Sequence, residues 1–149
     1  KMSIDDAILN KPGRLTPEEF EIMKTHTTIG ADMLRELGSH HAGNALMEYA
    51  YQIARWHHER WDGKGYPDGL KGDEIPIAAQ VVSVADVYDA LTSVRVYKDA
   101  IPHEEAIQMI LDGKCGTFNP LLLDCLLEVQ DQIAETLARP ADVVAFPTI

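Results

Sequence analysis

The segment from Ile77 to Ser93 constrains the fold more than any other part of the chain. It is the most apolar stretch of the sequence and is seventeen residues long. Its β-branched valines would also suit a strand, but strands average about 5–6 residues and the flanking segments have helical patterns. Apolar side chains cover nearly the whole circumference of such a helix, so we expect a central helix inside an all-α bundle.

Apolar residues at helical spacing predict further helices on both sides of this segment. Thr16 and Glu19 form a capping box with Pro17 at the first helical position, and Asn119-Pro120 is a second helix start. The expected elements are a short turn at residues 5–9, a helix that starts at residue 16 and ends before His26, and helices at about residues 28–37, 43–58, 103–112 and 120–137.

Residues 59–76 interrupt the helical pattern. Four glycines and a proline lie within residues 59–72, so this segment is not a helix. Loops of this length are usually functional or disordered, and the aromatic residues Trp61 and Tyr66 favour an ordered, packed loop. We expect one domain over residues 1–137 and a loosely held tail over residues 138–149.

Composition narrows the classes of function. A chain of 149 residues is the size of one domain, and its net charge of −11 argues against a general nucleic-acid binder, although a small anionic ligand remains compatible. Cys115 and Cys125 have no metal-binding or redox spacing, so we expect free thiols in the cytoplasm. No apolar run reaches the roughly 18 residues of a membrane span, and the first residues do not resemble a signal peptide.

Three histidines are the first candidates for chemistry. His57 and His58 are adjacent at the end of a predicted helix, where neighbouring side chains project about 100° apart. One imidazole can therefore face the bundle while the other faces a pocket, which suits two neighbouring metals. The alternative is a pair of surface histidines stacked on Trp56 or Trp61. His26 lies at a predicted helix junction, as a ligand or as a cap.

Asp86 is the fourth candidate because it lies in the middle of the central helix, where we expect burial on at least one side. A buried charge needs a cation or a metal. Asp89, one turn later, is either an exposed acid or a neighbour of the same site. Together with the three histidines, Asp86 gives a ligand mixture that suits Fe, Mn or Zn on a helical scaffold.

Arg95 and Lys98 follow the central helix directly. Arginine can bind a phosphate through two parallel hydrogen bonds, and lysine adds a point charge. The alternative interpretation is a cationic pair that complements the helix dipole at its C-terminal end.

Three stretches of the chain resemble the signature motifs of the HD-GYP domain of the HD superfamily. They are residues 57–67 (HHERWDGKGYP), residues 86–98 (DVYDALTSVRVYK) and residues 24–30 (KTHTTIG). The resemblance covers roughly residues 1–125. Residues 116–120 resemble a further segment of the family, to which we assign a structural role.

The resemblance implies a helical, metal-dependent phosphodiesterase that hydrolyses cyclic di-GMP to linear pGpG or GMP in bacterial signalling, with two or three divalent metals, commonly iron or manganese. It also implies a regulatory domain upstream and partners such as diguanylate cyclase-type domains. By position, the resemblance assigns metal binding to His26, His57, His58 and Asp86, substrate binding to Tyr66, Arg95 and Lys98, and a supporting role beside the metal site to Asp89.

The family's His-Asp pair belongs to a His-Asp-x-Gly-Lys pattern in which Lys1 matches the catalytic lysine. The pair itself would precede Lys1, so we expect an N-terminally incomplete bundle that is inactive by itself. The alternative function is a catalytically inactive module that senses cyclic di-GMP or binds a protein partner.

Overall fold

The computed structural model describes residues 4–39, 44–94 and 99–138, and this part of the chain is all-α, as the sequence predicts, with no strand. The elements are α1 (Asp6–Leu9), α2 (Pro17–Ser39), α3 (Ala45–Trp56), the short 3-10 helix η1 (Gly72–Glu74), α4 (Ile77–Thr92), α5 (His103–Leu111) and α6 (Pro120–Ala138). None of the helices in these ranges is long and apolar enough to cross a bilayer.

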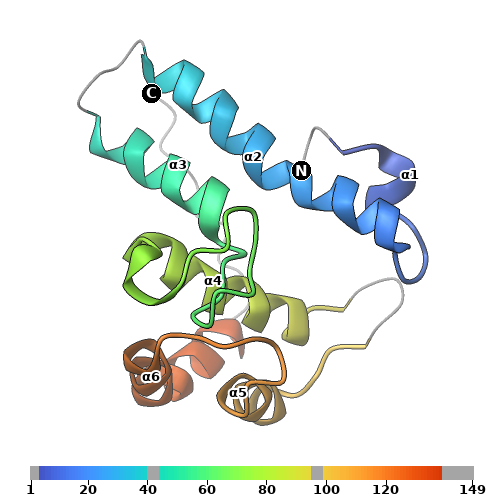
Figure 1. The fold of residues 1–149 in the computed structure, drawn as a ribbon. Helices are drawn as coiled ribbons and strands as arrows, with labels where there is room; N and C mark the ends of the chain where they lie inside the picture. Colours follow the sequence, from blue (N-terminus) through green and yellow to red (C-terminus); the bar gives the residue numbers. More distant parts are fainter. Residues whose placement is uncertain (1–3, 40–43, 95–98, 139–149) are drawn as a thin grey trace, which may run out of the picture.

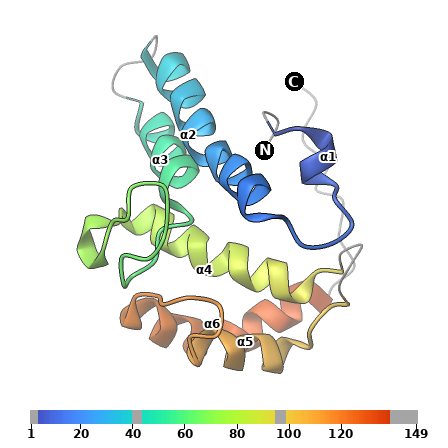
Figure 2. The same ribbon diagram turned by 45° about the vertical axis from the view of Figure 1, so that its right-hand side comes forward.

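The helices form layers around α4. Figures 1 and 2 show α2 and α3 side by side, with α4 crossing between this pair and the layer formed by α5 and α6. The core lies where α4 meets α5 and α6, and its buried members are Val84, Tyr88, Leu91, Ala106, Ile107, Ile110, Phe118 and Leu126. The central position predicted for α4 is therefore confirmed. The apolar side chains of α4 are nevertheless not all buried, because Ile77 and Val81 are 56% and 49% exposed.

One long helix replaces the two that we predicted between residues 16 and 37. α2 runs unbroken from Pro17 to Ser39, so the prediction that His26 lies at a helix junction is wrong. The hydroxyls of Thr25, Thr27 and Thr28 each donate to the carbonyl oxygen three residues earlier. These bonds satisfy the threonine side chains within the helix, so the threonine-rich segment does not end it.

The predicted caps are present. The amide of Glu19 donates to Thr16 Oγ1 at 3.2 Å, and the amide of Thr16 donates to Glu19 Oε2 at 2.7 Å. Asn119 caps α6 by accepting from the amide of Leu121 at 3.0 Å. The two cysteines are free thiols, as predicted. The predicted tail lies largely outside the described residues, which end at residue 138.

Candidate metal centre

Three histidines from two helices meet at one point. His26 lies in the middle of α2, and His57 and His58 follow the last residue of α3. One ring nitrogen from each histidine lies within 4.8 Å of the others, a grouping that can hold a metal ion. His26 is buried, while His57 and His58 are partly exposed. The structure thus brings together the three imidazoles that the sequence singled out.

Backbone hydrogen bonds set the tautomers of two of these rings. His26 Nδ1 lies 2.6 Å from the carbonyl oxygen of Met23, and His57 Nδ1 lies 2.7 Å from that of Ile53. A carbonyl oxygen only accepts, so each Nδ1 carries the proton and each neutral ring presents a lone pair at Nε2. A backbone bond of this kind is the usual orienting contact of a metal-binding histidine.

The two Nε2 atoms face one another at 3.4 Å. Two lone pairs at this distance repel unless a cation lies between them. At metal–nitrogen distances of about 2.0–2.1 Å, two imidazoles of a tetrahedral site are roughly 3.3–3.4 Å apart. The donor set therefore fits a transition metal.

His57 and His58 do not diverge as predicted from helical geometry. Their ring centroids are 4.1 Å apart, and His58 also meets His26 edge to face at 5.1 Å. His57 is the C-cap residue of α3 and keeps helical backbone angles, with φ −64° and ψ −13°. All three rings consequently serve one centre.

The loop after α3 lies against this centre, so the prediction of an ordered loop is confirmed. The ring of Tyr66 stacks on His58 with centroids 4.8 Å apart, and the amide of Tyr66 donates to the His58 carbonyl at 3.3 Å. The ring of Phe20 meets Tyr66 edge to face from α2. Burial raises the pKa of Tyr66 to about 12, with Asp86 adding to the rise and Arg60 opposing it. Tyr66 is therefore a neutral hydrogen-bond donor at neutral pH.

Glu59 holds the loop from inside, a role that sequence reasoning missed. It is 2% exposed, and its Oε1 accepts from the amides of Asp68 and Gly69 at 2.7 and 3.0 Å. Its Oε2 is buried and forms no hydrogen bond within the described residues. Burial raises the pKa of Glu59, and the backbone amides oppose that rise. The only sequence signal was a glutamate directly after the two histidines.

Gly65 passes over Glu59 so closely that a Cβ would collide with the backbone of Glu59 and Arg60. Only glycine fits at this point, which brings the Tyr66 ring down onto His58. The glycine in the Gly-Tyr-Pro sequence is thus required by packing of the loop against its own start.

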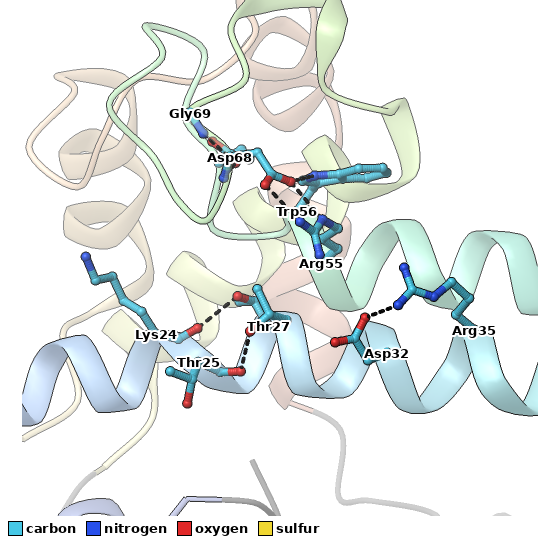
Figure 3. Close-up of polar contacts among 11 residues, drawn as sticks. Lys24, Thr25, Thr27, Asp32, Arg35, Arg55, Trp56, Asp68 and Gly69 are labelled. Carbon is cyan, nitrogen blue, oxygen red and sulfur yellow. Dashed lines mark hydrogen bonds and ion pairs between the residues drawn. The ribbon is translucent and has the colours of Figure 1, made fainter.

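Asp68 fixes the loop from outside. Figure 3 shows its carboxylate between two side chains of α3: Arg55 donates two hydrogen bonds at 2.7 and 2.8 Å, and the Trp56 indole donates a third at 2.8 Å. The Arg55 hydrogen bonds, followed by the Trp56 bond, lower the pKa of Asp68. The loop is therefore attached to the last turn of α3, where the two histidines begin.

Arg60 joins the same loop to α4 and to the segment before α6. Its guanidinium donates to Ser83 Oγ at 2.6 Å and lies 5.4 Å from the centroid of the Phe118 ring. Gly116 leaves space for it, since a Cβ there would meet the guanidinium. Burial lowers the pKa of Arg60, and the negative charge of Asp86 opposes that fall.

Asp86 differs from its prediction in one respect. The carboxylate is exposed, so the expected burial is wrong. The buried core residues of α4 pack against α5 and α6, and Asp86 is not among them. The charge of Asp86 raises the pKa of both Tyr66 and Arg60. Its oxygens are not among the donors grouped within 4.8 Å at the three histidines.

Asp89 is also exposed, and its Oδ1 accepts from Ser93 Oγ at 2.9 Å, at the end of its own helix. Lys1, Arg95 and Lys98, the three cations that the resemblance assigns to catalysis and substrate binding, lie outside the described residues.

The sequence of this chain is similar to those of known proteins. The family model described as HD domain matches residues 1–120. A probable cyclic di-GMP phosphodiesterase of Vibrio cholerae serotype O1 is 45% identical over 143 residues, which cover 95% of this chain and 32% of that protein. A cyclic di-GMP phosphodiesterase of Thermotoga maritima is 46% identical over 144 residues, which cover 95% of this chain and 37% of that protein.

A third relative has another substrate in its name. The 3'3'-cGAMP-specific phosphodiesterase 2 of Vibrio cholerae is 41% identical over 142 residues, which cover 95% of this chain and 26% of that protein. The chain thus spans about a third of the length of these relatives. The resemblance that the motifs indicated is confirmed by these matches, and the chain belongs to the HD domain family.

Proposed function

We propose that this chain is the metal-dependent phosphodiesterase domain of a protein that hydrolyses cyclic di-GMP to pGpG or GMP. The observation that carries the proposal is the pair of Nε2 atoms of His26 and His57, held 3.4 Å apart with His58 beside them. The names of relatives at 45% and 46% identity supply the substrate class.

The proposed ligand set has four members. His26, His57 and His58 bind through ring nitrogens, and Asp86 completes the set from α4. Two or three iron or manganese ions suit this mixture of imidazole and carboxylate. Transition metals bound here would supply Lewis acidity that activates water and stabilises negative charge on a phosphate.

The remaining residues orient and shield the centre. The Nδ1 bonds to Met23 and Ile53 hold two imidazoles in the neutral tautomer that binds metal. Tyr66 covers one face of His58 and excludes water from it. We assign a catalytic role to Lys1, and the substrate phosphates to Arg95, Lys98 and the Tyr66 hydroxyl, which keeps its proton at neutral pH because burial raises its pKa to about 12.

Turnover of two messengers tests the proposal. The parent protein, which carries this domain together with the residues that precede Lys1, is purified with added Mn²⁺ and is the protein used in every assay below. It is incubated with cyclic di-GMP and with 3'3'-cGAMP, and products are separated by chromatography. We expect cyclic di-GMP to be hydrolysed faster, and His57→Gln to abolish the reaction. Faster hydrolysis of 3'3'-cGAMP would reassign the substrate. Binding of cyclic di-GMP without any hydrolysis would instead support the sensing module.

We also propose a neighbouring domain, partners and a cellular location for this domain. The relatives are about three times as long as this chain, so we propose that the domain works beside a regulatory domain. Diguanylate cyclase-type domains are proposed partners because they make the proposed substrate. A cytoplasmic location follows from the same substrate, a bacterial second messenger.

A further inference from the structure

A groove of about 200 Å³ lies beside Tyr66. It runs between α2 and the loop and is lined by Glu21, Lys24, Thr25, Thr28, Tyr66 and Pro67. Tyr66 lines this groove and stacks on His58, so the groove adjoins the candidate metal centre through Tyr66. Of the residues that line the groove, the proposed ligand set and phosphate contacts use only Tyr66.

Lys24 contributes the cation among the residues that line the groove. Its ammonium lies 5.5 Å from the ring centroid of Phe20 and 5.7 Å from that of Tyr66. Figure 3 shows the side chain extending from α2 on the side of the helix where the loop lies. Two aromatic rings therefore hold the charge beside the groove, and its side chain remains 27% exposed.

The ion pair of Lys24 is weak enough to exchange. Its partner Glu21 lies at 2.7 Å, one helical turn earlier, and the Glu21 side chain is 69% exposed. Exposed pairs at this spacing contribute little to stability because water and salt screen them. An anion that enters the groove can therefore replace the Glu21 carboxylate at Lys24.

We propose that Lys24 binds the phosphate of a cyclic dinucleotide that is not being cleaved. The inference rests on the proposed function. A cyclic dinucleotide carries two phosphodiesters, and while one lies at the three histidines the other must lie to one side. In a chain of net charge −11, an ammonium next to the centre gives the second phosphate a favourable site.

The test compares substrates of different size. The protein with Mn²⁺ is assayed with cyclic di-GMP and with bis(4-nitrophenyl) phosphate, a small diester with one phosphate. The variants are Lys24→Met, Lys24→Arg and Glu21→Gln, with Lys64→Met as the matched control, because Lys64 is a loop lysine whose side chain is 84% exposed. Equilibrium binding of fluorescent cyclic di-GMP is measured for each.

For Lys24→Met we expect the ratio of kcat/KM for cyclic di-GMP to that for the small diester to fall about tenfold or more, with a matching rise in Kd. Lys24→Arg should keep most of both values, Lys64→Met should change neither, and Glu21→Gln should lower Kd by freeing the ammonium. If the Met variant does not fold, Lys24→Arg and Glu21→Gln still decide the question.

The possible failures are distinct. A wild-type protein that hydrolyses neither compound refutes the proposed function. An active wild-type protein whose substrate ratio is unchanged in Lys24→Met, or whose Kd rises in Glu21→Gln, overturns the assignment of Lys24 and leaves the proposed function standing.

Discussion

The imidazoles of His26 and His57 are oriented by main-chain carbonyls one turn earlier on their own helices. The Nδ1 contacts of 2.6 and 2.7 Å leave both Nε2 atoms directed at one another. The residue types were predictable because imidazole and carboxylate are the usual ligands of these metals. The meeting of the three rings could not be predicted, because it depends on how α2 packs against the end of α3.

Asparagine variants of Asp86 and Asp89 distinguish the proposed metal ligand, Asp86, from the nearby acid, Asp89. We expect Asp86→Asn to remove metal and phosphodiesterase activity together, because an amide is a poor ligand. Asp89 accepts a hydrogen bond from Ser93. The Asp89→Asn variant should therefore retain most of its metal and lose at most about 10–100-fold in activity. Metal analysis and turnover are measured side by side. If Asp89→Asn loses the metal and Asp86→Asn keeps it, the assignment is reversed.

The hydrogen bonds between Asp68 and Arg55 predict a pH effect on stability. The folded pKa of Asp68 is lowered, so its contribution is present above the unfolded value of about 3.9 and is lost as pH falls through the folded pKa. Because Asp68 is partly exposed, we expect Asp68→Asn to cost only about 1 kcal/mol at pH 7. Urea unfolding at pH 7 and pH 3 checks this. A difference between wild type and variant that is equal at both pH values contradicts the assignment.

The loop after α3 is built by contacts that no local pattern reveals. Its glycines predicted an irregular segment, and its aromatics predicted order. The buried Glu59 carboxylate and the close passage of Gly65 join residues that are apart within the loop, and the Arg60 contact with Ser83 joins the loop to α4. Helix starts could be predicted at Thr16 and Asn119 because a cap is local in sequence. Such long-range contacts could not.

Gly65→Ala tests whether the loop must lie this close to the end of α3. Its Cβ would meet the backbone of Glu59 and Arg60, which cannot move aside as a side chain can. We expect a loss of about 1–3 kcal/mol in the free energy of unfolding. Because Tyr66 follows directly, the KM for cyclic di-GMP should also rise. Thermal unfolding and steady-state kinetics measure the two effects.

Gly30→Ala is the matched control on α2. A Cβ there would lie 3.8 Å from Ala54 Cβ, an ordinary contact, and the residue is inside a helix. We expect this variant to gain about 0.5–1 kcal/mol in the free energy of unfolding. If both alanine variants lose stability equally, the collision at Gly65 is not the cause of its effect.

In the whole molecule the centre lies where α2 and the end of α3 meet the loop. Figure 2 shows α4 crossing next to the α2–α3 pair. The all-α class and the central α4 were predictable from periodicity, since apolar faces must be buried against other helices. The number of helices could not be predicted. The threonine hydroxyls of α2 donate hydrogen bonds to carbonyl oxygens of the same helix, so the helix continues through them. The exposure of Asp86 was not predictable either, because it depends on which face of α4 the other helices cover.

Metal-dependent turnover decides whether the three histidines form a hydrolytic centre. The protein is stripped of metal with a chelator, titrated with Mn²⁺ or Fe²⁺, and the hydrolysis of cyclic di-GMP is followed beside His57→Gln. We predict no turnover without metal, restoration on titration of the wild type, and no restoration of the variant. Equal turnover before and after metal addition, or full activity in His57→Gln, would contradict the role of these histidines.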